Sequence, residues 1–274
     1  MTGAGPRAPR TSRFPLGLER LNPAAPKASE VTLRPQRPLH EAVRDSSKKA
    51  PASGIGLDSA AVRGRMVKRL AAGGVRCDPV LAAFAAVPRH EFVDSALAAQ
   101  AYEDTSLPIG LSQTISKPSV VARMLALLFE GDLARRRGSL GRVLEVGTGC
   151  GYQTALLAQM SASVVSIERL KALHDRARVN LVGWRGADVR LVHGDGRLGH
   201  APNAPYDTIV AAAGGDEMPP AWLDQLAVGG RLVAPIFDAA SGGQALLVVD
   251  RSADGYMRRV HDAVHFVPLK SGTE

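Results

Sequence analysis

The sequence has few cysteines, few aromatic residues and no long uninterrupted apolar run. Two cysteines among 274 residues cannot form a disulfide framework, and they favour a reducing compartment. Charged residues divide the apolar segments, as Arg123 divides residues 120–129, so we expect no membrane span. Residues 1–30 contain no continuous apolar core of a secretory signal, which favours a cytoplasmic protein. Since aromatic residues make up only 4%, the core must consist mainly of Ala, Val and Leu.

Positive charge is concentrated at the start of the sequence. Residues 1–53 carry ten Lys/Arg and four Asp/Glu, which is +6 of the formal net charge of +8, and they contain eight prolines. This composition, without apolar periodicity, predicts that residues 1–56 form a disordered basic extension. Such an arm can contact nucleic acid or acidic partners, although a solvated extension without a specific partner is the simpler interpretation. The remaining residues are nearly neutral at +2.

The pattern of a folded domain begins at residue 57 and continues to residue 270. In its first part, residues 57–137, apolar residues recur at the spacing of amphipathic helices. The helices predicted there run from Asp58 to Gly73, from Asp78 to Pro88, over residues 91–99 and over Ser119–Phe129.

Residues 138–270 alternate short apolar strands with helices, which is typical of βαβ units and a parallel sheet. The predicted strands are Arg142–Val146, Ser163–Ile167, Val189–His193, Tyr206–Ala211, Gly230–Pro235, Ala245–Asp250 and Ala263–Val267. The predicted helices are Gln153–Met160, Lys171–Leu181 and Pro220–Leu226. Because little helix separates the last strands, we expect a Rossmann-like α/β sheet that is mostly parallel with an antiparallel C-terminal end, preceded by a small helical segment.

A glycine-rich loop follows the first of these strands. Gly147, Gly149 and Gly151 alternate with other residues, Thr148 among them, just before a helix. This arrangement is typical of a nucleotide-type ligand at the carboxyl end of a central strand. The spacing is one residue tighter than the dinucleotide fingerprint. Glu145 would repel a pyrophosphate but suits the cationic amino group and sulfonium of S-adenosylmethionine.

Acidic residues end the next two strands. Glu168 lies about where an acid that binds ribose is expected, although a solvated carboxylate is the alternative. Asp195, followed by Gly196, ends the third strand, where its carboxylate could meet the adenine amino group. An Asp-Gly pair is also a common turn.

Several segments closely resemble the protein-L-isoaspartate O-methyltransferases, which are class I S-adenosylmethionine-dependent methyltransferases. The resemblance is collinear over about residues 57–270 and is specific at Gln113–Pro118 (QTISKP). The other matching segments are Val87–Val93, Leu107–Gly110, Gly147–Thr154, Ile167–Arg169, Gly229–Leu232 and Phe266–Leu269.

The resemblance implies a repair enzyme that methylates the α-carboxylate of L-isoaspartyl residues in damaged proteins. It implies Ser116 as the active-site residue, with Gln113, Thr114 and Arg169 joining the cofactor-binding residues. A carboxylate is ionised at pH 7, so the reaction needs alignment and exclusion of water rather than a general base. From the residues alone, Ser116 is equally well explained as the N-cap of the following helix.

Two departures from the family pattern bear on activity. Ser112 stands where glycine is expected, and Gly214-Gly215 replaces a more apolar turn; either could weaken substrate binding. Cys150 takes the place of a serine of similar size. The alternatives to repair are a methyltransferase acting on RNA or a small molecule, and a non-catalytic cofactor-binding homologue. We expect a monomer. We also expect no metal, since no cluster of Cys or carboxylate ligands accompanies His261 and His265.

Overall fold

The computed structural model describes Met1, residues 60–184 and residues 186–274. The residues from 60 onward belong to one compact unit. The predicted extension, apart from Met1, and the proposed helix start at Asp58 lie outside the described residues. No helix within the described ranges is long and apolar enough to cross a bilayer.

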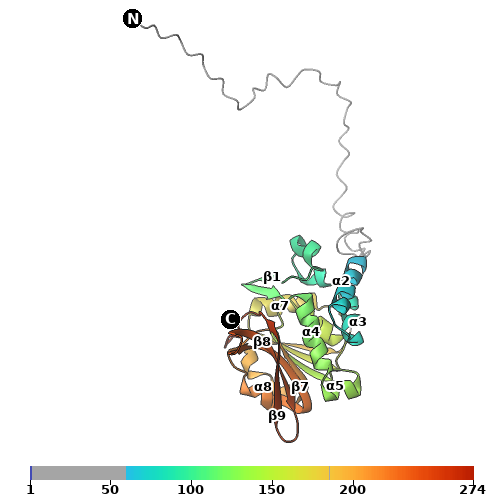
Figure 1. Cartoon of the computed structure of the whole chain (residues 1–274), viewed down its shortest axis with the longest axis vertical. Helices are drawn as coiled ribbons and strands as arrows, with labels where there is room; N and C mark the ends of the chain where they lie inside the picture. Colours follow the sequence, from blue (N-terminus) through green and yellow to red (C-terminus); the bar gives the residue numbers. More distant parts are fainter. Residues whose placement is uncertain (2–59, 185) are drawn as a thin grey trace, which may run out of the picture. The chain divides into compact units, whose positions relative to one another are not determined.

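A seven-stranded sheet with the order β5-β4-β3-β6-β7-β8-β9 forms the centre of this unit (Figure 1). Its strands are β3 (Arg142–Val146), β4 (Ser163–Glu168), β5 (Asp188–His193), β6 (Tyr206–Ala211), β7 (Leu226–Asp238), β8 (Gly243–Arg251) and β9 (Tyr256–Val264). The pairs from β5 to β7 are parallel, whereas β7–β8 and β8–β9 are antiparallel. The predicted Rossmann-like sheet with an antiparallel end is confirmed.

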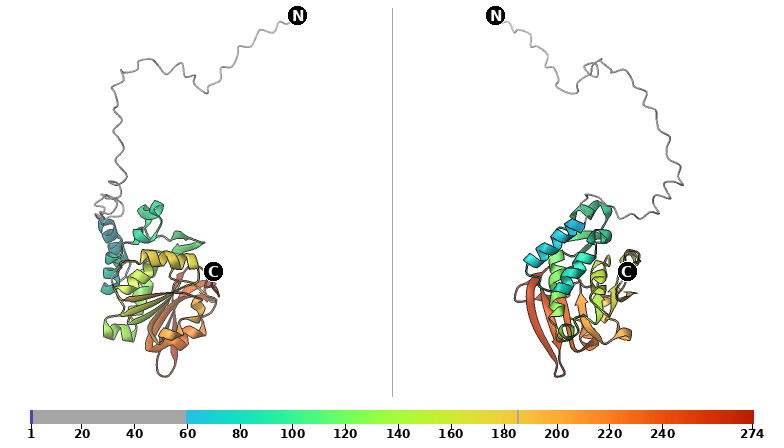
Figure 2. Two further views of the ribbon diagram at one scale, coloured as in Figure 1. Left: turned by 180° about the vertical axis from the view of Figure 1, so that it is seen from behind. Right: turned by 90° about the vertical axis from the view of Figure 1, so that its right-hand side faces the viewer.

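Helices cover both faces of the sheet (Figure 2). Val143 and Val164 face one core cluster, shared with apolar residues of the N-terminal helices and α6 (Tyr152–Ala158). Leu144 and Val165 face the opposite cluster, which Trp222 of α8 (Pro220–Gln225) fills. This strict alternation along each strand explains why the central strands are apolar at almost every position.

The residues before the sheet form a helical cap and a hairpin. The helices are α2 (Ala60–Ala72), α3 (Asp78–Ala86), α4 (Pro118–Phe129) and α5 (Asp132–Arg137), with short 3-10 turns η2 (Arg89–Phe92) and η3 (Ser95–Gln100). The hairpin consists of β1 (Leu107–Gly110) and β2 (Gln113–Ile115). Helix α7 (Lys171–Asn180) and the turns η4 (Gly196–Leu198) and η5 (Ala201–Asn203) complete the elements.

Two local predictions were wrong, and two elements were not predicted. The last strand was expected at Ala263–Val267, but β9 occupies Tyr256–Val264. The helix expected over 91–99 is replaced by η2 and η3. The hairpin and α5 were not predicted at all. Each of these segments is short or exposed, so no regular apolar pattern marks it.

Candidate functional site

A pocket opens at the carboxyl ends of β3 and β4, where the strand order reverses between β3 and β6. Ligands of open α/β sheets bind at such a switch point. Nine of the twelve predicted site residues line it: Gln113, Thr114, Ser116, Gly147, Thr148, Gly149, Glu168, Arg169 and Gly196. The segments that contribute them lie far apart in sequence, and the sheet brings them together.

The glycine loop is shaped by its backbone conformation. Gly147 and Gly149 have φ of 92° and 56°, in the left-handed region that favours glycine. A Cβ at Gly149 would lie 3.3 Å from Cδ1 of Ile109, which lies in β1. Glycine therefore lets the hairpin that contains Gln113–Ile115 pack directly on the loop. Gly151 caps α6 with φ of 91° and does not line the pocket.

Glu168 fastens this loop to the end of β4. Its Oε2 accepts a hydrogen bond from the Gly149 N–H at 2.9 Å, and its Oε1 accepts one from the Leu170 N–H at 3.0 Å. The side chain is buried at 5% exposure yet lines the pocket. Each carboxylate oxygen keeps lone pairs beyond its backbone bond. The geometry therefore leaves Glu168 able to accept two hydroxyl groups of a ligand.

Glu145 lies outside the pocket lining, beneath the loop. Its Oε2 accepts hydrogen bonds from the Thr154 hydroxyl at 2.5 Å and the Ser166 hydroxyl at 2.6 Å. Ser166 in turn lies 2.6 Å from the Thr148 hydroxyl, which does line the pocket. Burial raises the pKa of Glu145 to about 7, against the Ser166 and Thr154 hydroxyls and the Gln153 side chain, which lower it. Glu145 itself does not line the pocket, so its predicted contact with the cationic part of the cofactor stays a prediction.

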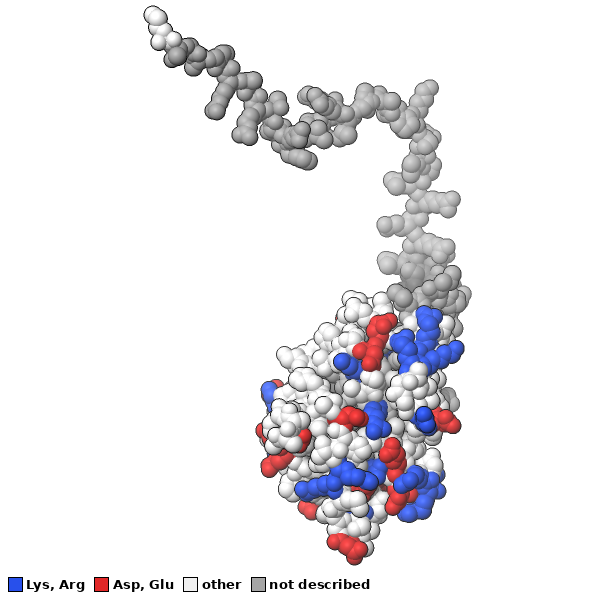
Figure 3. Space-filling model, viewed as in Figure 1, with Lys and Arg blue, Asp and Glu red and all other residues white. Residues whose placement is uncertain are grey.

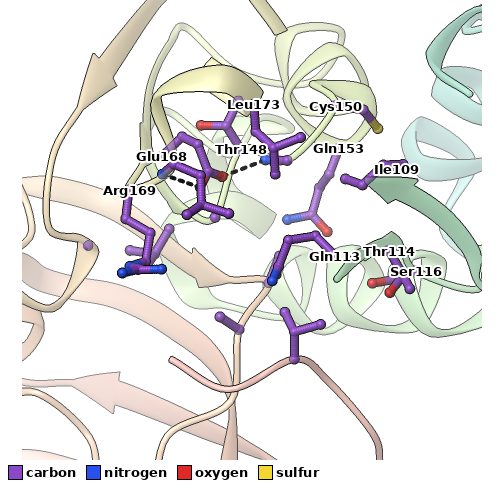
Figure 4. Close-up of a pocket in the computed structure, with 18 of the residues that line it drawn as sticks. Ile109, Gln113, Thr114, Ser116, Thr148, Cys150, Gln153, Glu168, Arg169 and Leu173 are labelled. Carbon is purple, nitrogen blue, oxygen red and sulfur yellow. Dashed lines mark hydrogen bonds between the residues drawn. The ribbon is translucent and has the colours of Figure 1, made fainter. Parts of the chain in front are cut away.

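Ser116 and Thr114 lie at the opposite end of the pocket from Glu168 and Arg169 (Figure 4). Helix α4 begins at Pro118, and its N-cap residue, Lys117, makes no side-chain cap. Asp104 caps the first turn instead, accepting from the Ser119 N–H at 2.8 Å. Ser116 is therefore not the N-cap, and its hydroxyl has no hydrogen-bond partner among the described residues.

Arg169 and Asp195 engage the C-terminal segment. Arg169 donates to the Gly272 carbonyl at 3.2 Å and pairs with Glu274 at 2.7 Å. Asp195 accepts from the Gly272 N–H at 2.7 Å and from the Arg197 N–H at 2.9 Å. Asp195 does not itself line the pocket, so its contact with an adenine amino group stays a prediction.

The segment Val267–Lys270 also lines the pocket; the sequence marked Phe266–Leu269 as part of the family resemblance but did not predict a place in the site. Gly214 holds it, since its N–H donates to the Val267 carbonyl and its carbonyl accepts from the Leu269 N–H. A Cβ at Gly214 would lie 2.4 Å from Nε2 of Gln244. The Gln244 amide donates to the Phe266 carbonyl at 3.3 Å and accepts from the Phe266 N–H at 2.7 Å. The unusual glycine pair thus makes room for the residue that anchors this segment.

Gln153 is a further residue that sequence reasoning missed. It lies in the first turn of α6, is 8% exposed and lines the pocket. Its amide Nε2 is buried and makes no hydrogen bond of normal geometry in the described part of the chain, although the side chain lowers the pKa of Glu145. Figure 4 shows the Gln153 amide and Gln113 directed into the same space. The available signal was its position as the second residue of the helix that follows the three glycines.

These groups suit S-adenosylmethionine. Glu168 offers acceptors for ribose hydroxyls, and the Gln153 amide, which makes no hydrogen bond of normal geometry, offers a donor for a ligand carboxylate. Ile109 and Leu173 add apolar side chains to the pocket lining. Burial raises the pKa of the Cys150 thiol, so that lining group stays neutral. Within residues 60–184 and 186–274, no three His, Cys, Asp or Glu side chains gather as metal ligands would.

Comparison with known proteins identifies the family. Residues 62–274 match the family model for protein-L-isoaspartate(D-aspartate) O-methyltransferase. The chain is 60% identical over 263 residues to a protein-L-isoaspartate O-methyltransferase of Methylibium petroleiphilum, covering 96% of this chain and 97% of that relative. It is 58% identical to one of Leptothrix cholodnii, covering 97% and 96%.

Solved structures agree. A protein-L-isoaspartate O-methyltransferase superposes with a TM-score of 0.67 at 28% identity, covering 76% of this chain and 66% of that one. A Plasmodium falciparum structure assigned to the same family, in complex with S-adenosyl-L-homocysteine, has a TM-score of 0.64 at 24% identity, covering 75% and 97%, and it shows the shared fold. The chain belongs to the protein-L-isoaspartate(D-aspartate) O-methyltransferase family.

Proposed function

We propose that this chain transfers a methyl group from S-adenosylmethionine to the α-carboxylate of L-isoaspartyl residues in damaged proteins. The observation that carries the proposal is that the two ends of the pocket offer different groups. Ribose acceptors on Glu168 lie at one end, and the free hydroxyl of Ser116 lies at the other. A methyl donor held at the first end is presented to an acceptor at the second.

The cofactor supplies an activated methyl group, so the residues of the chain have to bind, orient and exclude water. Glu168 would hold the ribose, while Gln113 and Gln153 would orient the amino-acid end. At the acceptor end, the hydroxyls of Ser116 and Thr114 would donate hydrogen bonds to the substrate carboxylate. Such alignment of an already ionised nucleophile accounts for catalysis without a general base.

Ser116→Ala tests the catalytic assignment. Without the hydrogen bond that aligns the substrate carboxylate with the methyl group, kcat falls by about tenfold to a hundredfold, while the affinity for S-adenosylhomocysteine is retained. Ser119→Ala in α4 is the matched control, because its hydroxyl already donates to Asp104 outside the pocket. Equal losses in the two variants would contradict a catalytic role.

The function is tested with labelled S-adenosylmethionine and paired peptides that contain isoaspartate or normal aspartate at one position. Label on the isoaspartyl peptide alone is the expected result. Tight cofactor binding without transfer to either peptide would instead support a non-catalytic homologue. Transfer to RNA or to a small molecule in preference to the peptide would support a different methyltransferase.

We further propose that the chain acts as a cytoplasmic monomer and needs no nucleic acid. Both cysteines are free thiols, as expected in a reducing compartment. On the face drawn in Figure 3, Lys/Arg and Asp/Glu side chains are interspersed, unlike the single-signed surface of a nucleic-acid-binding domain. Light scattering tests whether the chain is a monomer, and the same measurement with RNA tests whether it binds nucleic acid.

A further inference from the structure

A second hollow shares Ser116 with the cofactor pocket. Its walls come from the turn before α4, from Val120 in the first turn of α4, and from Val264 and His265 at the end of β9. Of the lining residues that the structure describes, Ser116 is common to both cavities. A substrate group that reaches Ser116 through this hollow meets the cofactor pocket at its acceptor end.

The charge of this hollow suits an anion. Among the described residues that line it, Lys117 is the single Lys or Arg, and none is Asp or Glu. The Lys117 side chain is exposed, and its ammonium has no hydrogen-bond or ion-pair partner in the part of the chain that the structure describes. Lys117 is also the N-cap of α4, a 12-residue helix, so the positive end of the helix dipole adds to its charge.

The nearby acids are already engaged. Asp104 accepts from the backbone N–H and the hydroxyl of Ser119, both at 2.8 Å. Asp262 pairs with Arg123 at 2.9 Å. Neither carboxylate is paired with Lys117, whose ammonium therefore remains available to an incoming anion.

The acceptor loses its charge during the reaction proposed above. A carboxylate oxygen forms the new C–O bond, the C–S bond breaks and sulfur keeps the electron pair. One negative and one positive charge thereby disappear. A cation beside Ser116 stabilises the substrate carboxylate but gains nothing from the neutral ester.

We propose that Lys117 is a substrate-capture residue that attracts the isoaspartyl α-carboxylate and lets its neutral methyl ester leave. The proposal depends on the proposed function. Because the attraction fades as the carboxylate loses its charge, Lys117 contributes to substrate binding and not to the chemical step. Lys117→Gln therefore raises KM and leaves kcat unchanged or slightly higher.

The test uses protein saturated with S-adenosylhomocysteine and two peptides that are identical except for one group. One peptide carries L-isoaspartate, and the other carries an α-carboxamide in place of the α-carboxylate. Calorimetric titration of Lys117→Gln should show about two- to fivefold weaker binding of the first peptide and unchanged binding of the second. Lys117→Arg should keep the preference. Lys68→Gln, an equal charge change on α2 outside both cavities, is the control.

Equal weakening for both peptides, or no weakening for either, would overturn the role of Lys117. Failure of the proposed function looks different, since the unaltered protein would then neither bind nor methylate any isoaspartyl peptide. The first result is a difference between variants, and the second is a property of the parent chain. The two failures are therefore distinguishable.

Discussion

The buried carboxyl of Glu145 should make the stability of this protein depend on pH. Burial raises its pKa from an ordinary value of 4.5 to about 7. A raised pKa in the folded state means that the protonated form is favoured there, so the stabilisation is complete below pH 4.5 and is lost as the pH rises through about 7. At about 1.4 kcal/mol per pH unit, the difference corresponds to about 3 kcal/mol of the free energy of unfolding.

Glu145→Gln removes this titration. The amide oxygen can still accept from the Thr154 and Ser166 hydroxyls, but the new NH2 takes the place of Oε1, which has no partner among the described residues. The absolute stability therefore also includes the cost of that group, and the informative quantity is the pH slope. Urea unfolding between pH 4.5 and pH 8 should show a flatter profile for Glu145→Gln than for the parent.

Glu103→Gln, at an exposed position, is the control and should leave the slope unchanged. Identical slopes for the parent and Glu145→Gln would refute the reasoning. That result would mean that Glu145 is as well solvated in the folded chain as in the unfolded one, or that water enters beneath the loop.

Three other perturbations have defined outcomes. Ser112 has φ of 57°, so Ser112→Gly should raise the unfolding free energy by about 1 kcal/mol in urea titrations, and a decrease would contradict a strained turn. Glu168→Gln can no longer accept from both the Gly149 and Leu170 N–H groups, so calorimetry should show S-adenosylhomocysteine binding at least about tenfold weaker; unchanged affinity would argue against the ribose role. Removing residues 1–56 should leave kcat/KM for an isoaspartyl peptide unchanged, because the pocket lining begins at Ile109, and a large loss would give the extension a role in the reaction.

The central strands could be predicted because they are buried on both faces. Arg142–Val146 and Tyr206–Ala211 have the predicted bounds. By contrast, β9 is an edge strand and nearly all of its residues are exposed. Its sequence includes Arg258 and Arg259, charges that protect an exposed edge and also erase the apolar alternation of a strand. Sequence reasoning therefore placed the last strand too late.

The hairpin was missed for a different reason. Its two-residue turn, Leu111 and Ser112, has positive φ at both positions, where Asn-Gly is the usual signal. Only the family resemblance at Leu107–Gly110 and Gln113–Pro118 pointed to that region. Tertiary packing against Gly149 stabilises a turn that local propensity would not predict.

At the site, nine predicted residues meet in one pocket because consecutive strand ends of a parallel sheet share an edge. Strand alternation in the sequence is enough to predict which face of the sheet Glu145 occupies. Residues two apart on a strand share a face, so Glu145 lies on the face of Val143, beneath α6, whereas Leu144 and Val146 share the opposite core. Gln153 and Val267–Lys270 lie in or next to segments that match the family, but local patterns do not show that they line the pocket, since that depends on long-range packing.

The C-terminal side of the pocket has a consequence for synthesis of the chain. A ribosome completes Ile109 long before Val267–Lys270, and the pocket needs both. A nascent or truncated chain that stops before Val267 has the glycine loop and Ser116 but lacks the segment held by Gly214. Ligand-linked stabilisation acts only on chains able to bind. The cofactor would therefore protect finished molecules from proteolysis and leave incomplete ones exposed to it.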